Sequence, residues 1–388
     1  MGLFAVWHDY ARRRTKPRGA DDCDQARCYD RRGRTRLGLG AYLGILLAAT
    51  PLLAEPFRLC LFHSELSRKA PGLLYRDITS NAPSVVEAAD RIARGRCDVL
   101  GLLGFDYDYN GVALSAFTDT IIAQGGPSYP YRFALRPNVG WPSFVDLDMD
   151  GRLGTPSDAQ SYGRFYGEGG MAILSQVPIL ASDAKDFSQV LWRDLPWATL
   201  PKTAEGPFFS EAALAKQRLS TTGHWVVPIR IDGAELKVLL YHASPPVFDG
   251  PEDRNGLRNA DETLFWLNYI EQQNLTDFAI LGAANLDPVA GDGRKQAIRD
   301  LLDSPRISDP FQSMTREDSL TVDWSDIDLG RMRTDYILPF AEYRVTSAGT
   351  IWPRPEAQEP SRHALVWVEL SQAHNETSVN LETSAASK

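Results

Sequence analysis

The sequence predicts a single α/β domain built from mixed β-sheets. Its 388 residues are enough to bury a large core, and 43% hydrophobic with 23% charged residues is typical of a globular protein. Short apolar runs with strand patterning alternate along the chain with segments in which apolar residues recur at helical spacing. We therefore expect one domain over residues 55–370, followed by a disordered polar tail over residues 371–388.

The first half of this domain begins with a strand, a helix and a second strand. Residues 57–62 form a short apolar run, and residues 97–105 form a longer one that predicts a buried strand. Between them, residues 82–95 have the spacing of an amphipathic helix. A further apolar run predicts a strand over residues 169–179.

The second half is predicted to start with a hairpin and to continue with a packed helix. Residues 224–231 and 235–243 are two strand-like runs separated by a short turn. Residues 258–272 have an acidic first turn and place Phe265 and Trp266 on a packed helical face. The remaining elements are a strand that ends near residue 282, a helix, and strands over 333–340 and 363–370.

The first 54 residues are predicted to be a targeting segment. Four arginines within 31–36 precede an apolar stretch over 37–54, which Pro51 interrupts near its end. This pattern predicts a signal peptide over 31–54 with cleavage after Ala54, because proline and glycine weaken a spanning helix. The protein would then be secreted or periplasmic with no stable membrane span; an uncleaved membrane anchor is the alternative. Residues 1–30 are an atypical polar extension, for which a start codon placed too early is one explanation.

The charge balance argues against nucleic acid as a partner. Residues 1–54 hold ten Lys or Arg and five Asp or Glu, so their removal changes the formal charge from −9 to −14. A strongly acidic protein repels a polyanion unless a local groove or bound metal reverses the field.

The two cysteines of the expected domain leave two alternatives. Cys60 and Cys97 each lie near the beginning of a predicted strand. A disulfide would suit an oxidising compartment. We favour two buried free thiols, because unpaired cysteine is commonly buried.

The segment ILGAANLDP, residues 280–288, indicates a buried strand that ends in a functional loop. Gly282 allows the chain to turn, and Asn285 and Asp287 follow at the strand end, where binding and catalytic residues often lie. A hydrolase loop of this kind normally carries an acid beside the asparagine, but Ala283 and Ala284 occupy that space.

The order of these segments resembles the endonuclease/exonuclease/phosphatase superfamily, in particular its secreted bacterial members with the signature PPVFDGPEDRNG at 245–256. The resemblance covers roughly the whole chain after residue 54. It implies a four-layer α/β sandwich, in which two packed mixed sheets are flanked by helices and the active site lies at the strand ends of one rim. The matching stretches lie at 98–108, 170–175, 224–228, 281–288, 333–338 and 362–370.

The resemblance also implies metal-dependent hydrolysis of phosphate esters. A divalent cation, usually Mg²⁺, would stabilise charge on the phosphoryl group, while an Asp activates water and an Asn orients it. Histidines would supply protons or hydrogen bonds to the phosphoryl oxygens. Four positions retain the family's residue types: His242, Asn285, Asp335 and His363.

Four other positions depart from the family's pattern. His63 stands where the first strand carries an Asn, and Gly104 replaces the metal-binding Glu of the second strand. Ala283 and Arg362 replace two Asp residues at the metal. Because Mg²⁺ requires oxygen ligands and Arg362 adds positive charge, the sequence predicts a pseudoenzyme or a strongly impaired phosphoesterase.

Several alternatives remain open at this site. An active phosphoesterase would need a rearranged metal site, for example a transition-metal site of His63, His242 and His363. Glu65, Asp106, Asp108 and Glu168 are nearby acids that would serve a rebuilt site. Arg362 with the histidines would instead bind a phosphate or sulfate anion, or Arg362 would pair with a neighbouring carboxylate. The expected partner is a phosphorylated small molecule or another protein.

A separate motif at 146–158 predicts a calcium loop. Asp146, Asp148 and Asp150 alternate and precede Gly151, which matches the first half of a loop of the EF-hand type. The twelfth position is a serine, so Asp158 is the expected substitute ligand. Bound Ca²⁺ would hold the long loop in place; an acidic loop without metal is the alternative.

Two further polar features have structural and functional alternatives. His224 precedes a strand and is expected to form hydrogen bonds within the fold. The polar cluster at 249–256 is either a rim of the active site or a network that stiffens the loop after His242.

Overall fold

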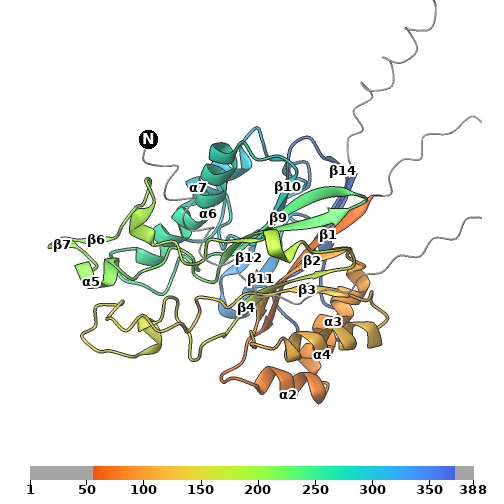
Figure 1. Cartoon of the computed structure of the whole chain (residues 1–388), viewed down its shortest axis with the longest axis horizontal. Coiled ribbons are helices and arrows are strands. Elements are labelled where there is room, and N and C mark those ends of the chain that lie inside the picture. The colour runs from red at the N-terminus through yellow and green to blue at the C-terminus, as the bar shows by residue number, and fades with distance from the viewer. Residues whose placement is uncertain (1–55, 372–388) are drawn as a thin grey trace, which may run out of the picture. The chain divides into compact units, whose positions relative to one another are not determined.

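A computed structural model describes residues 56–371, so the predicted extension and signal peptide, and residues 372–388 of the tail, lie outside the described residues. Within this range the chain forms an α/β fold with two larger mixed sheets flanked by helices, as the sequence predicts (Figure 1). No helix in residues 56–371 has the length and apolarity needed to cross a membrane.

The larger sheet has six strands in the order β14-β15-β1-β2-β4-β3. The other sheet has five strands in the order β13-β10-β9-β8-β5. The strands of the first are β1 (Phe57–Leu66), β2 (Val99–Phe105), β3 (Tyr131–Phe133), β4 (Gly170–Ser175), β14 (Arg344–Ile351) and β15 (Leu365–Ser371). Those of the second are β5 (Lys185–Asp186), β8 (His224–Ile231), β9 (Ala234–His242), β10 (Phe278–Ala283) and β13 (Asp335–Pro339). Two small ribbons pair β6 (Lys202–Thr203) with β7 (Gly206–Pro207), and β11 (Val322–Trp324) with β12 (Gly330–Met332).

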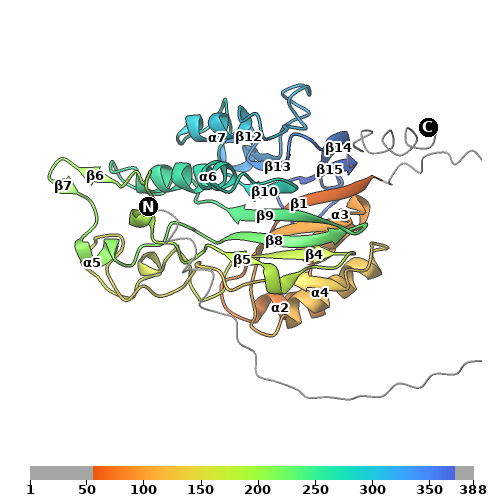
Figure 2. The same cartoon turned by 45° about the horizontal axis from the view of Figure 1, so that its top comes forward.

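Helices cover the outer side of each sheet. Figure 2 shows α6 and α7 on one side of the paired sheets and α2 and α4 on the other. The helices are α2 (Leu73–Thr79), α3 (Pro83–Gly95), α4 (Val112–Ala123), α5 (Glu211–Leu214), α6 (Arg254–Gln273) and α7 (Lys295–Leu302). Neither α2 nor α4 is among the helices predicted from the sequence, although the buried positions of α4 recur at helical spacing.

The core has two layers, one on each face of the larger sheet. Residues such as Phe62, Leu102 and Phe117 pack strands β1 and β2 against α2, α3 and α4. On the other face the two sheets meet so closely that a Cβ atom on Gly101 would lie 2.9 Å from Leu240 Cδ1. This close contact explains why β2 carries a glycine at that position.

A disulfide joins Cys60 to Cys97, with a Cα–Cα distance of 5.8 Å. The expectation of two free thiols is therefore wrong. Strand β1 pairs in parallel with β2, so Cys60 lies opposite Leu100, and Cys97 lies just before the same strand. Parallel pairing brings the two sulfur atoms together across 37 residues of sequence, which the spacing of the cysteines alone does not reveal.

Parallel pairing also gathers the ends of the central strands at one rim. In the larger sheet β1 and β2 run in parallel, and His63 lies opposite Leu103. In the other sheet β9 and β10 run in parallel, with His242 opposite Ala283. Ala283 also pairs with Asp335 at the start of β13. The polar residues at these strand ends therefore lie next to one another.

Candidate functional site

Three histidines from three separate segments meet at this rim. His63 is on β1, His242 ends β9, and His363 lies just before β15. The ring centre of His63 is 4.8 Å from that of His242 and 4.3 Å from that of His363. All three side chains line one cavity of about 740 Å³, which is the size of a small-molecule site.

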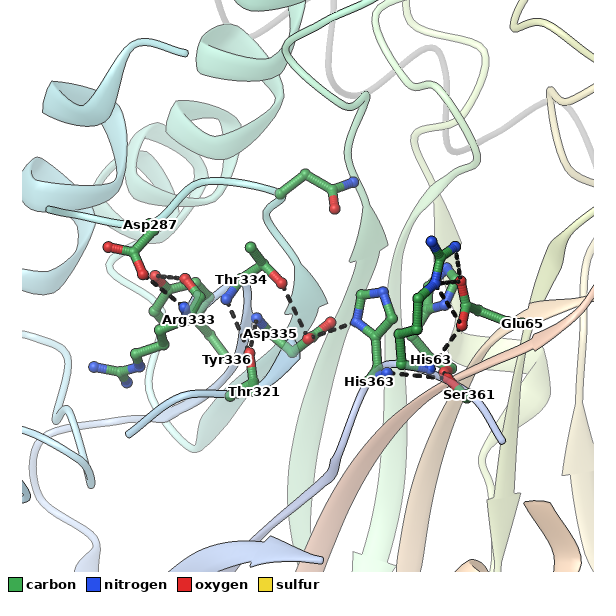
Figure 3. Close-up of polar contacts among 12 residues, drawn as sticks. His63, Glu65, Asp287, Thr321, Arg333, Thr334, Asp335, Tyr336, Ser361 and His363 are labelled. Carbon is green, nitrogen blue, oxygen red and sulfur yellow. Dashed lines mark hydrogen bonds and ion pairs between the residues drawn. The ribbon is translucent and has the colours of Figure 1, made fainter. Parts of the chain in front are cut away.

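His363 is oriented by a carboxylate. Its Nδ1 lies 2.8 Å from Oδ2 of Asp335, and both residues are almost fully buried (Figure 3). Thr334 donates a second hydrogen bond to the same oxygen at 3.2 Å. Because Asp335 holds Nδ1, the ring of His363 is fixed with its Nε2 edge as the remaining polar edge.

The rings of His63 and His242 are neutral at physiological pH. Burial is the main reason that the pKa of His63 is lowered to about 3, and the nearby His363 lowers it further. Burial likewise holds the pKa of His242 well below its usual value. The Nδ1 atom of each ring is buried and has no hydrogen-bond partner among the described residues. The proton is therefore expected on Nε2, at the edge of the ring that faces the cavity.

His63 fills the space that a longer side chain at Gly104 would need. Gly104 has φ +66°, and a Cβ atom there would lie 2.9 Å from Cε1 of His63. A glutamate at this position would therefore have a strained backbone and a clash with an aromatic ring. The replacements at His63 and Gly104 are sterically linked.

Arg362 is held by Glu65. Its Nη2 and Nε donate to Oε1 of Glu65 at 2.6 and 3.1 Å, and its backbone N–H donates to Oε2 at 2.8 Å. Burial alone would raise the pKa of Glu65, but its hydrogen bonds with Arg362 lower that pKa to about 2. The alternative in which Arg362 pairs with a neighbouring carboxylate is the one observed.

Ala283 pairs with His242 between β10 and β9, and Ala284 and Asn285 follow it at the same rim. Ala283 and Ala284 are fully buried, while Asn285 lines the cavity. Asn285 has φ 52° and donates from Nδ2 to the carbonyl of Ala243 at 2.8 Å. Its Oδ1 is the atom left for a ligand, because the amide nitrogen already has a partner.

Asp287 has a structural role. It is buried and accepts hydrogen bonds from the backbone N–H groups of Val289 and Arg333, and from the side chain of Arg316. These bonds tie the end of the 280–288 loop to the segment before β13. Asp287 is not among the residues that line the cavity.

The nearby acids that would rebuild a metal site are engaged elsewhere. Asp106 accepts from the backbone of Gly169 and Arg68, and Asp108 accepts from the first turn of α4. Glu168 forms an ion pair with Arg164. Among the described residues, the one convergent group of three or more metal-binding side chains is Asp146, Asp148 and Asp158. The three histidines are close, but they do not form such a group.

The predicted calcium loop brings three of its four aspartates together. One carboxylate oxygen each from Asp146, Asp148 and Asp158 lies within 4.8 Å of the others. Oδ1 of Asp148 is buried without a partner among the described residues, and burial raises the pKa of this carboxyl group. Asp150 is not part of the group; its Oδ1 accepts from the backbone N–H of Arg152 at 2.8 Å. The carboxylate at Asp158, and not the serine before it, completes the cluster.

One side of α6 holds loops that form the cavity wall. Arg258 donates to the carbonyl of Leu219, and Asn259 donates to those of Ser244 and Ala284. Asp261 accepts from the indole N–H of Trp192, and Glu262 accepts from the backbone N–H groups of Thr221 and Ser244. All four of these helix residues are buried.

This role of α6 was not predicted from the sequence. The sequence places the acidic residues of 258–272 in the first turn of a helix, but α6 begins earlier, at Arg254. Asp261 and Glu262 therefore lie well inside the helix and are buried. The sequence signal for it is that Asp261 and Glu262 lie one helical turn before Phe265 and Trp266, on the same face of the helix.

His224 and the polar cluster at 249–256 also form hydrogen bonds within the fold. His224 is fully buried, with Nδ1 2.7 Å from Ser220 Oγ and Nε2 3.0 Å from the carbonyl of Glu262. The expectation of internal hydrogen bonds for His224 is confirmed. In the 249–256 cluster, Asn255 donates from its backbone N–H to Asp249 and from its side chain to the carbonyl of Val247. Asn255 also lines the cavity, so this cluster is both a network and a rim.

Comparison with known proteins gives one family and a set of distant structures. The family described as Endonuclease/Exonuclease/phosphatase matches residues 72–363. No curated protein matches the chain.

Three solved structures illustrate the degree of similarity. A family protein from Leptotrichia buccalis is 15% identical, with a TM-score of 0.48, covering 81% of this chain and 99% of that one. The human nocturnin catalytic domain is 13% identical, with a TM-score of 0.45, covering 83% and 96%. A mannosyl-6-phosphatase from Bacteroides thetaiotaomicron is 12% identical, with a TM-score of 0.47, covering 81% and 99%.

Proposed function

The chain belongs to the endonuclease/exonuclease/phosphatase family, and we propose that it keeps the phosphoesterase scaffold without magnesium-dependent hydrolysis. The observation that carries this proposal is the set of side chains found where the resemblance implies metal ligands. Arg362 is bound to Glu65, and the ring of His63 occupies the space beside Gly104. A cationic guanidinium therefore lies where the resemblance implies a metal ligand.

The residues at this rim do not fit Mg²⁺. This ion requires near-octahedral coordination by oxygen atoms, usually with carboxylates. Two carboxylates line the cavity, Glu65 and Glu168. Both oxygen atoms of Glu65 already accept hydrogen bonds from Arg362, and Glu168 forms an ion pair with Arg164. The remaining groups are imidazoles and the amide oxygen of Asn285, which are poor substitutes for the lost acids.

What remains is suited to binding a polar ligand without a metal. The neutral rings of His63 and His242 offer N–H donors, and Asp335 orients the ring of His363 beside them. Arg362 adds further donors at the same rim, with its side chain 39% exposed. Phosphate oxygens are good acceptors for the hydrogen bonds that these side chains donate. We therefore propose that the protein binds a phosphorylated small molecule.

The direct test is hydrolysis of a panel of phosphate monoesters and diesters, with Mg²⁺, Mn²⁺, Ca²⁺ or Zn²⁺ added in turn. We expect no metal-dependent turnover from the folded protein. Binding of inorganic phosphate, measured by calorimetry without added Mg²⁺, should be detectable and should be lost in His242→Ala. Metal-stimulated turnover that disappears in His242→Ala would instead establish an active enzyme with a rearranged metal site.

For the second site we propose calcium bound by Asp146, Asp148 and Asp158. The convergence of three carboxylates supports a cation, because like charges at this distance otherwise repel each other. The unpartnered Oδ1 of Asp148 supports it further. The oxygen-only ligand set and flexible loop favour Ca²⁺ over a transition metal.

Thermal unfolding with and without Ca²⁺ tests this site. Saturating Ca²⁺ at 100 times its Kd should stabilise the fold by about 2.7 kcal/mol, and Asp148→Asn should abolish most of that gain. Asp150→Asn is the matched control, since Asp150 lies outside the convergent group. Equal effects of the two substitutions, or no response to Ca²⁺, would exclude the proposed site.

We also propose that the protein is secreted or periplasmic. The predicted signal peptide supports this, and so does the Cys60–Cys97 disulfide, because such bonds persist in oxidising compartments. Cell fractionation with sequencing of the N-terminus would test both points. A cytoplasmic protein that retains residues 31–54 would contradict the proposal.

A further inference from the structure

Phe248 has an unusual combination of conformation and exposure. It lies in the loop that follows His242, its φ is 68°, and its side chain is 87% exposed. A bulky residue rarely adopts this left-handed conformation, which favours glycine, and such strain is concentrated at functional sites. Burial of the ring does not compensate for the strain, because most of the ring faces solvent.

Phe248 lines the same cavity as the histidines. The lining combines polar and apolar side chains. His63, His242 and His363 are among the polar ones. Leu147, Trp192, Phe209, Val247 and Phe248 are apolar, and among them Phe248 is the most exposed.

A phosphate group alone would use only the polar side chains. Its oxygen atoms would pair with the imidazole N–H groups, while the exposed ring of Phe248 would stay in contact with water. Burying apolar surface is favourable, and flat aromatic rings gain further from stacking on one another. A ligand that fits the whole cavity therefore carries a flat apolar group next to its phosphate.

We propose that the ligand is a small phosphate monoester with a flat apolar group, which lies against Phe248. This rests on the proposed function, in which the histidines bind the phosphate. A small molecule fits the cavity of about 740 Å³, and the acidic charge of the chain disfavours a polyanionic polymer. Phe248 is then a specificity residue, because its exposed ring lines the cavity and contacts the ligand.

Phe144 provides a matched control within the same chain. Its φ is 63° and it is 88% exposed, so its backbone and exposure are nearly those of Phe248. Phe144 is not among the residues that line the cavity. Substitution of either residue removes the same ring from solvent, but only substitution at Phe248 should affect the ligand.

The test compares three probes by calorimetry on the full chain without added Mg²⁺: phenyl phosphate, glycerol phosphate and inorganic phosphate. We expect phenyl phosphate to bind at least about tenfold more tightly than the other two. Phe248→Ala should remove that advantage and leave inorganic phosphate unchanged, whereas Phe144→Ala should change neither. Phe248→Gly should keep or raise the melting temperature, since glycine tolerates the left-handed backbone, yet it should lose the preference for phenyl phosphate.

The possible failures can be told apart. If all three probes bind equally well and His242→Ala abolishes binding, the phosphate site stands and the apolar subsite is wrong. Equal effects of Phe248→Ala and Phe144→Ala would also overturn the role of Phe248. If the folded protein binds none of the probes, both the proposed function and this inference fail.

Discussion

His363 has a buried carboxylate partner, Asp335, in a site where we propose that the metal-binding acids have been lost. The contact with Asp335 depends on two buried side chains whose geometry the surrounding strands define. By contrast, a side chain binds a metal ion tightly only when the other ligands of the same ion are also present. Once His63 fills the space beside Gly104 and Arg362 pairs with Glu65, restoring one acid cannot restore the set.

The steric link between His63 and Gly104 leads to a prediction about these side chains. The combination His63→Asn, Gly104→Glu, Ala283→Asp and Arg362→Asp should gain magnesium-stimulated hydrolysis of at least about tenfold over the parent. The same set with His63 retained should not, because the new side chain at 104 would meet the imidazole ring. Steady-state assays of both variants, after circular dichroism has shown that they fold, provide the measurement.

Either of two results would contradict it. Equal gains in both variants would show that His63 does not block the position. No gain in either folded variant would mean that these four positions do not correspond to the metal site of the family.

At the scale of one element, α6 connects the core to the cavity wall. Arg258, Asn259, Asp261 and Glu262 hold loop segments that follow other elements, and all are buried. Burying such groups is costly unless each has partners. Here the partners are backbone groups of the loops and the indole N–H of Trp192. The polar residues of α6 therefore fix the shape of the cavity.

Glu262 makes the stability of this helix region depend on pH. Burial raises its pKa to about 7, although Arg258 and the hydrogen bonds from Ser244 and Thr221 oppose the shift. The unfolded chain would release this proton near the usual value of 4.5. Between these values the folded state binds more protons, so the contribution of Glu262 is complete below pH 4.5 and is lost as the pH rises through 7.

Glu262→Gln should remove this pH dependence. The free energy of unfolding of the parent, relative to that of Glu262→Gln, should fall as the pH rises from 4.5 to 7, by at most about 1.4 kcal/mol per pH unit. Urea unfolding at several pH values measures the difference. Glu271→Gln, at an exposed position of the same helix, is the control. A parent that gains stability over Glu262→Gln in this range would refute the assignment.

For the whole molecule, the disulfide ties the first two strands of the larger sheet. Cys60 and Cys97 are both fully buried beneath α3 and are separated by 37 residues. Closing a loop of that length restricts the unfolded chain. The bond therefore stabilises the fold mainly by lowering the conformational entropy of the unfolded chain.

Removing the bond should lower the free energy of unfolding by about 4 kcal/mol according to the chain-entropy relation. The variant Cys60→Ala/Cys97→Ala and the parent under reducing conditions should unfold at similar urea concentrations, both below that of the oxidised parent. If reduction has no effect on the parent while the double variant is destabilised, packing and not the crosslink accounts for the loss.

Much of the fold follows from local patterns in the sequence. The strands over 224–231 and 235–243, the helix over 82–95 and the buried strand near 280 lie within a few residues of β8, β9, α3 and β10. These elements were predictable because burial on one face imposes a period of two in a strand and of 3.6 in a helix. The family was also predictable, because its segments occur in the family's order along the chain.

Tertiary structure alone decided which of these residues interact. Arg362 and Glu65 are 297 residues apart, and only the meeting of β1 with the segment before β15 makes them an ion pair. The same is true of the Cys60–Cys97 bond and of the buried carboxylates on α6. Local periodicity reports which face of an element is buried, but a pairing partner depends on how distant strands are arranged. Local patterns and their order along the chain were therefore enough to predict the family and the main elements, while the packing of the sheets determined which side chains meet at the rim.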